Sequence, residues 1–372
     1  MKARIHLVAG VRPNFMKIAP VYHALADRGE VQPIIVHTGQ HSSAEMSDVF
    51  FRDLNLPPPN YHLNVMGETH AQQTAAVLIG YESLCRRERP DWTIVVGDVN
   101  STLGACLAAK KLNIPVAHLE AGLRSGDRSM PEEINRLAVD AISDLLWTHS
   151  EDADANLVRE GIPPSRIERV GNVMIDAYHS LFELIAKAGL PERLGLATGQ
   201  YAVITLHRPV NVDDFAALSL AVAQLIQLTK VMPVVFPVHP RTKKQLVRHD
   251  LWQRLERAGL ILLEPLSYIE FMSLVKSCAV VITDSGGVQE ETSYLGIPCL
   301  TARDSTERPV TVSMGTNRLI SLSSISKEAI AAQGRERHPC AIPLWDGKAA
   351  SRIVKSLQFR LNNIPGSVQP KC

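Results

Sequence analysis

The feature that most constrains the fold is an alternation of short apolar runs with helical segments along the whole chain. The runs at residues 4–10 and 92–98 are continuously apolar and rich in β-branched residues, as strands buried on both faces are. The segments at 69–87 and 101–112, which lie between such runs, are amphipathic or alanine-rich. This alternation predicts an α/β fold in which helices cover both faces of a parallel sheet.

The pattern occurs twice, and a length of 372 residues favours two domains over one. We therefore expect two doubly wound, Rossmann-like domains, at 1–172 and 173–349. The predicted strands are 4–10, 33–39, 92–98, 116–122, 145–150 and 167–171, then 201–207, 234–239, 260–264, 279–283, 298–301 and 318–321. The predicted helices of the second half are 214–229, 243–258, 267–277 and 288–295, and a last helix is expected from about 348 to 362.

Composition excludes several classes of function. Lys plus Arg number 39 and Asp plus Glu number 38, so the net charge of +1 indicates neither a nucleic-acid partner nor a membrane surface. No apolar run approaches the roughly 20 residues of a membrane span, and the first run is too short for a signal peptide, so we expect a cytoplasmic protein. The six cysteines form no CxxC pair and no HExxH motif occurs, so no metal site is expected.

A strand-to-helix turn at 281–291 is the first candidate site. The apolar run stops at Asp284, Ser285-Gly286-Gly287 follows, and a helical segment then begins. The exposed N–H groups and the dipole of a helix start favour an anion, most often a phosphate, and glycines allow its close approach. Gly-Gly can also serve simply to turn the chain. Glu291, one to two turns into the helix, suits sugar hydroxyls.

In open parallel sheets, ligands bind beyond the carboxyl ends of the strands, so polar residues at those ends are candidates. In the first half, Arg12 and Lys17 follow the first run and could hold a phosphate or carboxylate, or could be two surface cations. Asp98 could be a helix cap and Glu132 could complement a helix dipole, but Glu120 interrupts an apolar run. Three carboxylates at neighbouring strand ends favour one acidic pocket.

The second half offers mostly bases and cations at its strand ends. His207 and Arg208 follow one run, His239 ends the next, and Arg308 follows the strand after the Ser-Gly-Gly turn. His41, after the second run of the chain, could be a ligand or a helix cap. A phosphate site in one domain and carboxylates in the other are typical of nucleotide-sugar enzymes. No Gly-x-Gly-x-x-Gly turn follows the first run, so nicotinamide chemistry is not expected.

Taken together, seven motifs in order resemble those of the non-hydrolysing UDP-N-acetylglucosamine 2-epimerases, over nearly the whole chain. They are the segments 10–20, 97–98, 118–126, 131–136, 205–208, 283–291 and 303–309. The resemblance implies a GT-B fold with a cleft between two domains, a last helix that returns to the first domain, no redox cofactor and a homodimer. It also implies interconversion of UDP-GlcNAc and UDP-ManNAc, or of close relatives, as a supply for surface polysaccharide.

The resemblance, together with the strand-end positions, yields one set of candidate site residues. The expected catalytic residues are Asp98, Glu120, Glu132 and His207. The expected substrate-binding residues are Arg12, Lys17, His41, Arg208, His239, Ser285, Gly286, Gly287, Glu291 and Arg308. The chemistry implied is loss of UDP, removal of the C2 proton to give a glycal, and re-addition with inversion.

The chain departs from the family pattern at two places. Asn14 stands where many relatives have Glu, and Pro209-Val210-Asn211 replaces an Arg-Glu-Asn sequence, so substrate activation is not carried over as an expectation. Alternatives that the sequence leaves open are a modified substrate such as a diacetamido uronic acid derivative, a GT-B glycosyltransferase, a hydrolysing epimerase and a nucleotide-sugar sensor.

Overall fold

The structure is a computed structural model that describes residues 2–39, 51–338 and 340–362. The chain divides into two compact units, the first formed by 1–180 with 343–372 and the second by 181–342. The boundary expected after residue 172 falls at the start of helix α7 (Val173–Lys187), and the observed division lies within that helix. Each unit is described by itself.

The first unit is built on a seven-stranded parallel sheet in the order β3-β2-β1-β4-β5-β6-β7. Its strands are β1 (Ala3–Ala9), β2 (Val31–His37), β3 (Tyr61–His62), β4 (Trp92–Val96), β5 (Val116–Leu119), β6 (Leu145–Thr148) and β7 (Ile167–Arg169). The two-residue strand β3, which pairs with β2, was not expected from the sequence.

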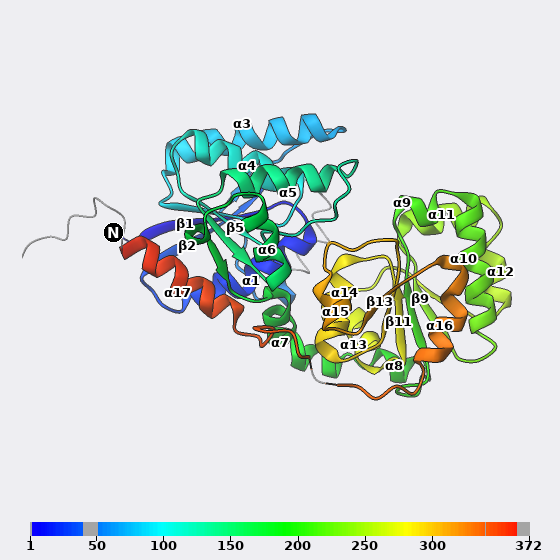
Figure 1. Cartoon of the computed structure of the whole chain (residues 1–372). Coiled ribbons are helices and arrows are strands. Elements are labelled where there is room, and N and C mark those ends of the chain that lie inside the picture. Colours follow the sequence, from blue (N-terminus) through cyan, green and yellow to red (C-terminus); the bar gives the residue numbers. More distant parts are fainter. Residues whose placement is uncertain (1, 40–50, 339, 363–372) are drawn as a thin grey trace, which may run out of the picture. The chain divides into compact units, whose positions relative to one another are not determined.

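Helices cover both faces of this sheet, as the continuous apolar strands require. Figure 1 shows α1 (Arg12–Ala26) and α17 (Ala349–Asn362) on one side and α3 (His70–Glu88), α4 (Asn100–Lys111) and α5 (Pro131–Ile142) on the other. The unit also contains α6 (Glu151–Arg159), the 3₁₀ turn η1 (Pro164–Arg166) and the start of α7. The last helix therefore packs beside the first, although the sequence between them is long.

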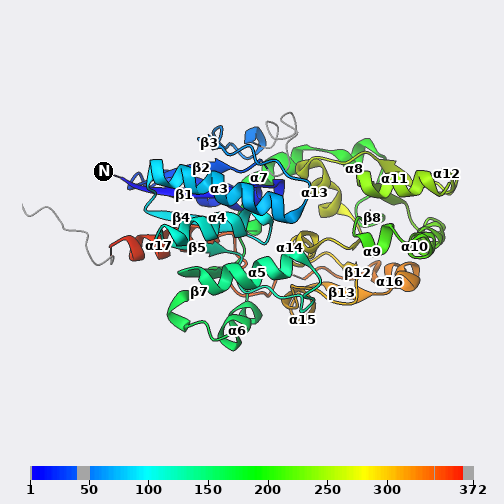
Figure 2. The same ribbon diagram turned by 90° about the horizontal axis from the view of Figure 1, so that it is seen from above.

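The second unit repeats this plan with six parallel strands in the order β10-β9-β8-β11-β12-β13. Its strands are β8 (Ala202–Thr205), β9 (Val234–Pro237), β10 (Ile261–Leu263), β11 (Val280–Thr283), β12 (Cys299–Ala302) and β13 (Asn317–Ile320). Figure 2 shows α10 (Phe215–Leu228) and α16 (Ile325–Ala332) on one side of the sheet and α13 (Tyr268–Ser277), α14 (Gly286–Leu295) and α15 (Val310–Ser313) on the other. The short α8 (Leu190–Arg193), α9 (Pro209–Val212) and η2 (Leu322–Ser324) complete it.

The helix expected at 243–258 is two helices, α11 (Pro240–Arg248) and α12 (Trp252–Arg257). Asp250 separates them with a φ of 56°, a left-handed conformation that ends an α-helix. The apolar spacing continues across this break, because Leu246, Leu251 and Leu255 all pack into the core of the second unit. A hydrophobic pattern can therefore span a turn that it does not reveal.

The strand order places the candidate residues. The strand order reverses between β1 and β4 in the first unit and between β8 and β11 in the second. Ligands of such sheets bind at the carboxyl edge next to this reversal. Asp98 and Glu120 come shortly after the neighbouring strands β4 and β5, and His207 and Asp284 come shortly after the neighbouring strands β8 and β11. Among the helices of the described ranges, none combines the length and apolar character needed to cross a membrane.

The return of the C-terminal segment depends on a close backbone approach. Gly171 has a φ of 90°, and a Cβ there would collide with the carbonyl oxygen of Leu344. The adjoining Trp345 is buried and its indole N–H donates to the carbonyl of His149 over 2.9 Å. Glycine is therefore required at 171 for two reasons, its backbone conformation and the contact.

We expect Gly171→Ala to lower the free energy of unfolding by about 3 kcal/mol, because strain at positive φ and overpacking each cost about 1–3 kcal/mol. Gly161→Ala is the matched control, because Gly161 has a φ of 84° but nothing within 4 Å of the place that a Cβ would occupy. That change should cost only the strain, about 1 kcal/mol. Urea unfolding followed by the fluorescence of Trp92, Trp147 and Trp345 measures both, and equal losses would contradict the role of the contact.

Candidate active site

Glu120 lies at the carboxyl edge of the first unit as a buried, paired carboxylate. It follows β5 with 8% of its surface exposed and forms an ion pair with the ammonium of Lys17 on α1. Its φ is 72°, which a non-glycine residue adopts only at a cost of about 1–2 kcal/mol. Such strain persists where the surrounding structure imposes it, and it is concentrated at functional sites.

Asp98 is also paired, through a guanidinium that sequence reasoning did not assign. One Nη of Arg136, on α5, donates to the Asp98 carboxylate. Its other Nη donates to Glu133 over 2.6 Å. Glu133 additionally accepts the N–H groups of Ser125 and Gly126 at 3.0 and 2.9 Å. Burial would raise the pKa of Glu133, but the Ser125 N–H and Arg136 outweigh it, and the net shift is downward.

The two neighbouring acids at the start of α5 therefore have different environments. Glu133 is 2% exposed and holds the loop before the helix, whereas Glu132, the expected catalytic residue, is only half-buried. Helical geometry places consecutive residues on different faces, and the sequence alone does not say which face is buried. Of the two, Glu132 is the more accessible to a ligand.

The start of α1 contains Arg12 and Asn14. Arg12 is exposed at the first position of the helix. The Asn14 side chain accepts the N–H groups of Gly10 and Val11 at 3.2 and 3.3 Å and donates to the carbonyl of Val96 over 3.2 Å. An amide makes both kinds of bond, so Asn14 joins the turns after β1 and β4. His41 lies outside the described residues.

In the second unit, Ser285 is the residue before α14, with no capping hydrogen bond from its side chain, and Gly286 and Gly287 begin the first turn, as the turn at 281–291 predicts. A Cβ on Gly286 would lie 2.5 Å from the guanidinium of Arg308, so glycine is required there by a cation rather than by the ligand. Gly287 has nothing within 4 Å of a Cβ and is open. Arg308 is fixed by Glu290 at 2.6 Å and by Glu307 at 2.7 Å.

Three arginines converge on Glu307 near the start of α14. Arg308 and Arg303 contact its carboxylate at 2.7 and 2.8 Å, and Arg208 lies 3.6 Å away. Burial raises the pKa of Glu307, but Arg308 and Arg303 outweigh it and lower the pKa to about 2. One Nη atom of Arg303 is buried with no hydrogen-bond acceptor in the described part of the chain. Positive charge and open N–H groups together favour an anion.

His207 and His239 belong to a second feature of this unit. Asp284 accepts from the Nδ1 of His207 at 2.8 Å and from the backbone N–H groups of His207 and Arg208 at 3.0 and 2.9 Å. His207 and His239 have ring centres 5.5 Å apart. A cavity of about 220 Å³ is lined by Thr205, Leu206, His207, Pro237, His239, Pro265, Leu266, Phe271, Ser285 and Val288. The structure thus brings His207, His239 and Ser285 together beside an apolar wall.

Glu291 is buried in α14. Burial, and to a smaller extent the negative charge of Glu290, raises its pKa to about 8. A hydrogen bond with the Tyr268 hydroxyl lowers the pKa by less. Since the usual pKa of a glutamate is about 4.3, a pKa raised to about 8 favours the protonated carboxyl group at neutral pH. It is poised to ionise when a group that donates hydrogen bonds to it arrives.

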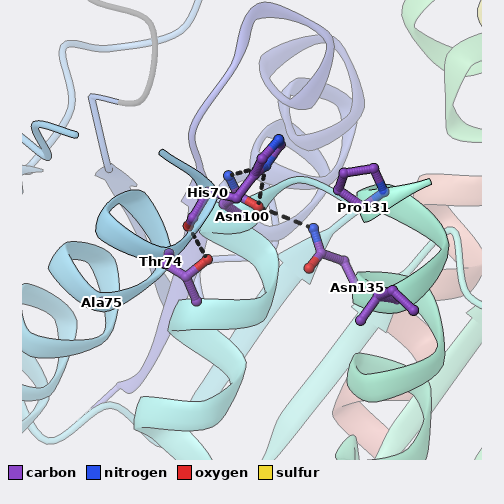
Figure 3. Close-up of a pocket in the computed structure, with 8 residues that line it drawn as sticks. His70, Thr74, Ala75, Asn100, Pro131 and Asn135 are labelled. Atoms are coloured by element: carbon purple, nitrogen blue, oxygen red, sulfur yellow. Dashed lines mark hydrogen bonds between the residues drawn. The ribbon is translucent and has the colours of Figure 1, made fainter. Parts of the chain in front are cut away.

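A larger cavity, of about 460 Å³, opens in the first unit beside the Asp98 turn (Figure 3). It is lined by His70, Ala71, Thr74, Ala75, Asn100, Pro131, Ile134 and Asn135. Asn135 donates to the carbonyl of Asp98 over 2.8 Å, and Asn100 donates to Gln73 over 2.7 Å. Amides with fixed partners and apolar side chains form its walls. Sequence reasoning did not find it, because its residues come from three separate helices.

Over the described ranges, no group of three or more His, Cys, Asp or Glu side chains is arranged to hold a metal ion. The residues that sequence reasoning missed are chiefly partners of those it found. They are Arg136, Glu133 and Asn14 in the first unit and Asp284 and Glu307 in the second, whereas Arg303 was expected beside the phosphate site together with Arg308. The only sequence signal for them is their place within the same motifs.

Comparison with known proteins gives a consistent result. A family model described as UDP-N-acetylglucosamine 2-epimerase matches residues 23–358. The UDP-N-acetylglucosamine 2-epimerase of Methanocaldococcus jannaschii is 39% identical over 363 residues, covering 96% of this chain and 99% of that protein. The UDP-2,3-diacetamido-2,3-dideoxy-D-glucuronate 2-epimerase of Pseudomonas aeruginosa is 39% identical over 364 residues, covering 95% and 99%.

A solved structure confirms the predicted fold class. The M. jannaschii UDP-GlcNAc 2-epimerase, crystallised in complex with UDP-GlcNAc and UDP, matches with a TM-score of 0.87 and 39% identity, covering 96% of this chain and 99% of that one. The fold is thus α/β, with two Rossmann-like domains built on parallel sheets of seven and six strands.

The neighbours Glu132 and Glu133 allow a matched test of stability. We expect Glu133→Gln to cost about 1.5–3 kcal/mol, because it weakens charge-assisted bonds to two amides and a guanidinium. Glu132→Gln should change stability by less than about 0.5 kcal/mol. Because the folded pKa of Glu133 is lowered, its contribution is present above the unfolded value and is lost as pH falls through the folded pKa. Urea unfolding at neutral and acidic pH measures both variants, and equal stability would contradict this assignment.

Proposed function

Because the chain belongs to the UDP-N-acetylglucosamine 2-epimerase family, and is therefore a UDP-sugar 2-epimerase and an isomerase, we propose that it interconverts UDP-GlcNAc and UDP-ManNAc. The family membership confirms the resemblance found in the motifs. The observation that carries the proposal is the pairing of Asp98 and Glu120 with Arg136 and Lys17 after neighbouring strands. Two carboxylates positioned by cations after neighbouring strands are suited to act as bases at a sugar ring.

The second unit supplies the groups for the leaving nucleotide. The first turn of α14, at Gly286 and Gly287, presents the N–H groups of a helix start, and Arg308 lies fixed beside Gly286. We place the diphosphate there, since helix starts and guanidinium groups bind phosphates. The ribose hydroxyls would then donate to Glu291, and the cavity lined by Phe271 and Leu266 would take the uracil ring.

The chemistry requires departure of UDP before the C2 proton is removed. The C2–H of an N-acetyl sugar has no carbonyl beside it, so direct abstraction is unfavourable. When UDP leaves with its charge stabilised by cations, C1 becomes electron-deficient and the C2 proton becomes acidic. A carboxylate takes that proton to give a glycal. Protonation of C2 from the opposite face and return of UDP to C1 complete the inversion.

Asp98, Glu120 and Glu132 are the proposed acid and base groups, and His207 the proposed catalytic residue of the second unit. Removal and return of a proton on opposite faces of one carbon require more than one such group. We further propose that the protein acts as a homodimer, as the family resemblance implies.

A modified substrate is the second candidate. The P. aeruginosa relative named for a diacetamido glucuronate substrate has the same 39% identity as the M. jannaschii relative named for UDP-GlcNAc. All the residues proposed above act on C1, C2 and the nucleotide, which both sugars share. Identity alone therefore does not choose, and the assay must offer both sugars.

In deuterated water, we expect the protein to place deuterium at C2 and to form the 2-epimer of its substrate. UDP-GlcNAc and UDP-2,3-diacetamido-2,3-dideoxyglucuronate are supplied in parallel, and NMR and mass spectrometry follow the products. Asp98→Asn and Glu120→Gln should each lower kcat by about 10²–10⁴-fold with UDP binding retained, the range for loss of a general acid or base. Epimerisation without solvent deuterium, or free sugar and UDP as first products, would overturn the mechanism.

We expect the affinity for UDP to rise with pH between 6 and 8, by up to about tenfold per pH unit. Glu291 has a pKa raised by burial to about 8, and ribose hydroxyls favour its ionised form, so binding releases a proton. Calorimetry in two buffers of different ionisation enthalpy counts this proton. Glu291→Gln is the control, because the titration of the UDP phosphate remains while the Glu291 contribution disappears. The same proton release in both proteins would contradict the assignment.

A further inference from the structure

Side chains hold three successive carbonyls of the turn after β4, those of Val96, Gly97 and Asp98. The carbonyl of Gly97, next to Asp98, accepts from the Nε2 of His118 at 2.8 Å. The preceding and following carbonyls accept from Asn14 at 3.2 Å, from Thr102 at 2.7 Å and from Asn135 at 2.8 Å. His118 and Gly97 have no exposed polar atom in this contact, since His118 is fully buried. The imidazole of His118 therefore helps to fix the backbone next to Asp98.

The same imidazole is tied to a buried carboxylate on α5. The Nδ1 of His118 donates to Asp140 over 2.6 Å, and the other oxygen of Asp140 accepts the backbone N–H of Gly122 at 3.0 Å. Residues 118 and 122 flank Glu120, whose φ is 72°. One carboxylate therefore holds the chain on both sides of the strained residue.

We propose that His118 and Asp140 form a positioning pair that sets the two carboxylates, Asp98 and Glu120, relative to one another. The inference rests on the proposed function of those carboxylates. His118 reaches the turn of Asp98, and Asp140 reaches both flanks of Glu120. Neither His118 nor Asp140 is itself placed at the reacting atoms.

The electrostatics of the pair are consistent with this role. A carbonyl only accepts, so in the contact with Gly97 the Nε2 of His118 is the donor. Burial would raise the pKa of Asp140, but His118 and Arg124 outweigh it and the pKa is lowered. Arg124 lies 2.7 Å from Asp140 and is bound to Glu160 at 2.6 Å. The cluster is fully satisfied, which makes it rigid.

Precise placement matters for this reaction more than for most. A proton must leave one face of C2 and another must arrive on the opposite face, so two carboxylates must keep a fixed separation. Misplacement by about 1 Å can cost about 10²-fold in rate. If one carboxylate moves, the proton more often returns to the face it left. Deuterium then enters the substrate without inversion.

His118→Asn is the sharpest variant, because its amide can take the place of Nδ1 and keep Asp140, while the bond to Gly97 is lost. We expect kcat to fall by about 10²-fold with KM and UDP affinity unchanged. The decisive readout is the ratio of C2-deuterated substrate to deuterated epimer at early times, which should rise severalfold. A merely structural loss lowers the amount of active enzyme and leaves that ratio unchanged.

Two further variants are compared under the same conditions. Asp140→Asn should retain much of the turnover, because an amide of the same size can keep a hydrogen bond to the Nδ1 of His118 and still accept from Gly122 and Arg124. Tyr81→Phe is the matched structural control. Tyr81 is fully buried in the same unit and contacts Thr93 at 2.8 Å and His6 at 3.1 Å, so its loss costs stability but should leave the ratio unchanged.

The wild-type protein tests the proposed function separately from the positioning role of His118. If it incorporates no deuterium at C2, the proposed function fails. If it does, an unchanged ratio in His118→Asn overturns the positioning role, and so does a loss in Asp140→Asn as large as in His118→Asn. Should His118→Asn not fold, His118→Gln, which keeps the Gly97 bond and loses Asp140, replaces it. Failure of both to fold while Tyr81→Phe folds would show a structural role and overturn the inference.

Discussion

A carboxylate at the end of a buried parallel strand is expensive unless a cation lies against it, and the first unit is arranged around this constraint. Lys17 meets Glu120 and Arg136 meets Asp98, so the N-terminal parts of α1 and α5 both have to lie at the carboxyl edge of the sheet. The helices therefore do more than cover the strands. Their N-terminal halves carry the cations that pair with the two carboxylates at this edge of the sheet.

The second unit, in contrast, concentrates positive charge that needs a carboxylate partner. Arg208, Arg303 and Arg308 approach one another around Glu307, whose pKa is lowered to about 2, chiefly by Arg308 and Arg303. Without that carboxylate the three guanidinium groups would repel one another. With the Glu307 carboxylate in place, the three guanidinium groups are fixed beside the start of α14, and their positive charge favours an anion there. Gly286 is part of this arrangement, since Arg308 occupies the space that a side chain would need.

The sequence predicts the parts of this protein that depend on periodicity. Continuous apolar runs located every strand except β3, which has two residues, and the strand ends located Asp98, Glu120 and His207. The break at Asp250 was not predicted, because the leucine spacing continues across it. Nor was the difference between Glu132 and Glu133, since both suit a first helical turn and only packing decides which is buried. Partners such as Arg136 and Asp140 depend on contacts between elements, which no local pattern encodes.

The residues of the proposed mechanism are, for a physical reason, unable to define the substrate. In that proposal the carboxylates act at C2 and the helix start and arginines act on the diphosphate, whereas a diacetamido uronic acid differs from N-acetylglucosamine at C3 and C6. Selection between such sugars must come from side chains whose only task is to meet those positions. A carboxylate at C6 would need a cation or free N–H groups, and an added acetamido group would need an apolar wall with amide partners. The cavity beside the Asp98 turn offers an apolar wall with amide partners, because it is lined by alanines, Asn100, Asn135 and His70. Its lining residues include no lysine or arginine that could pair with a carboxylate. Its lining is therefore the place where relatives with different substrates should differ first.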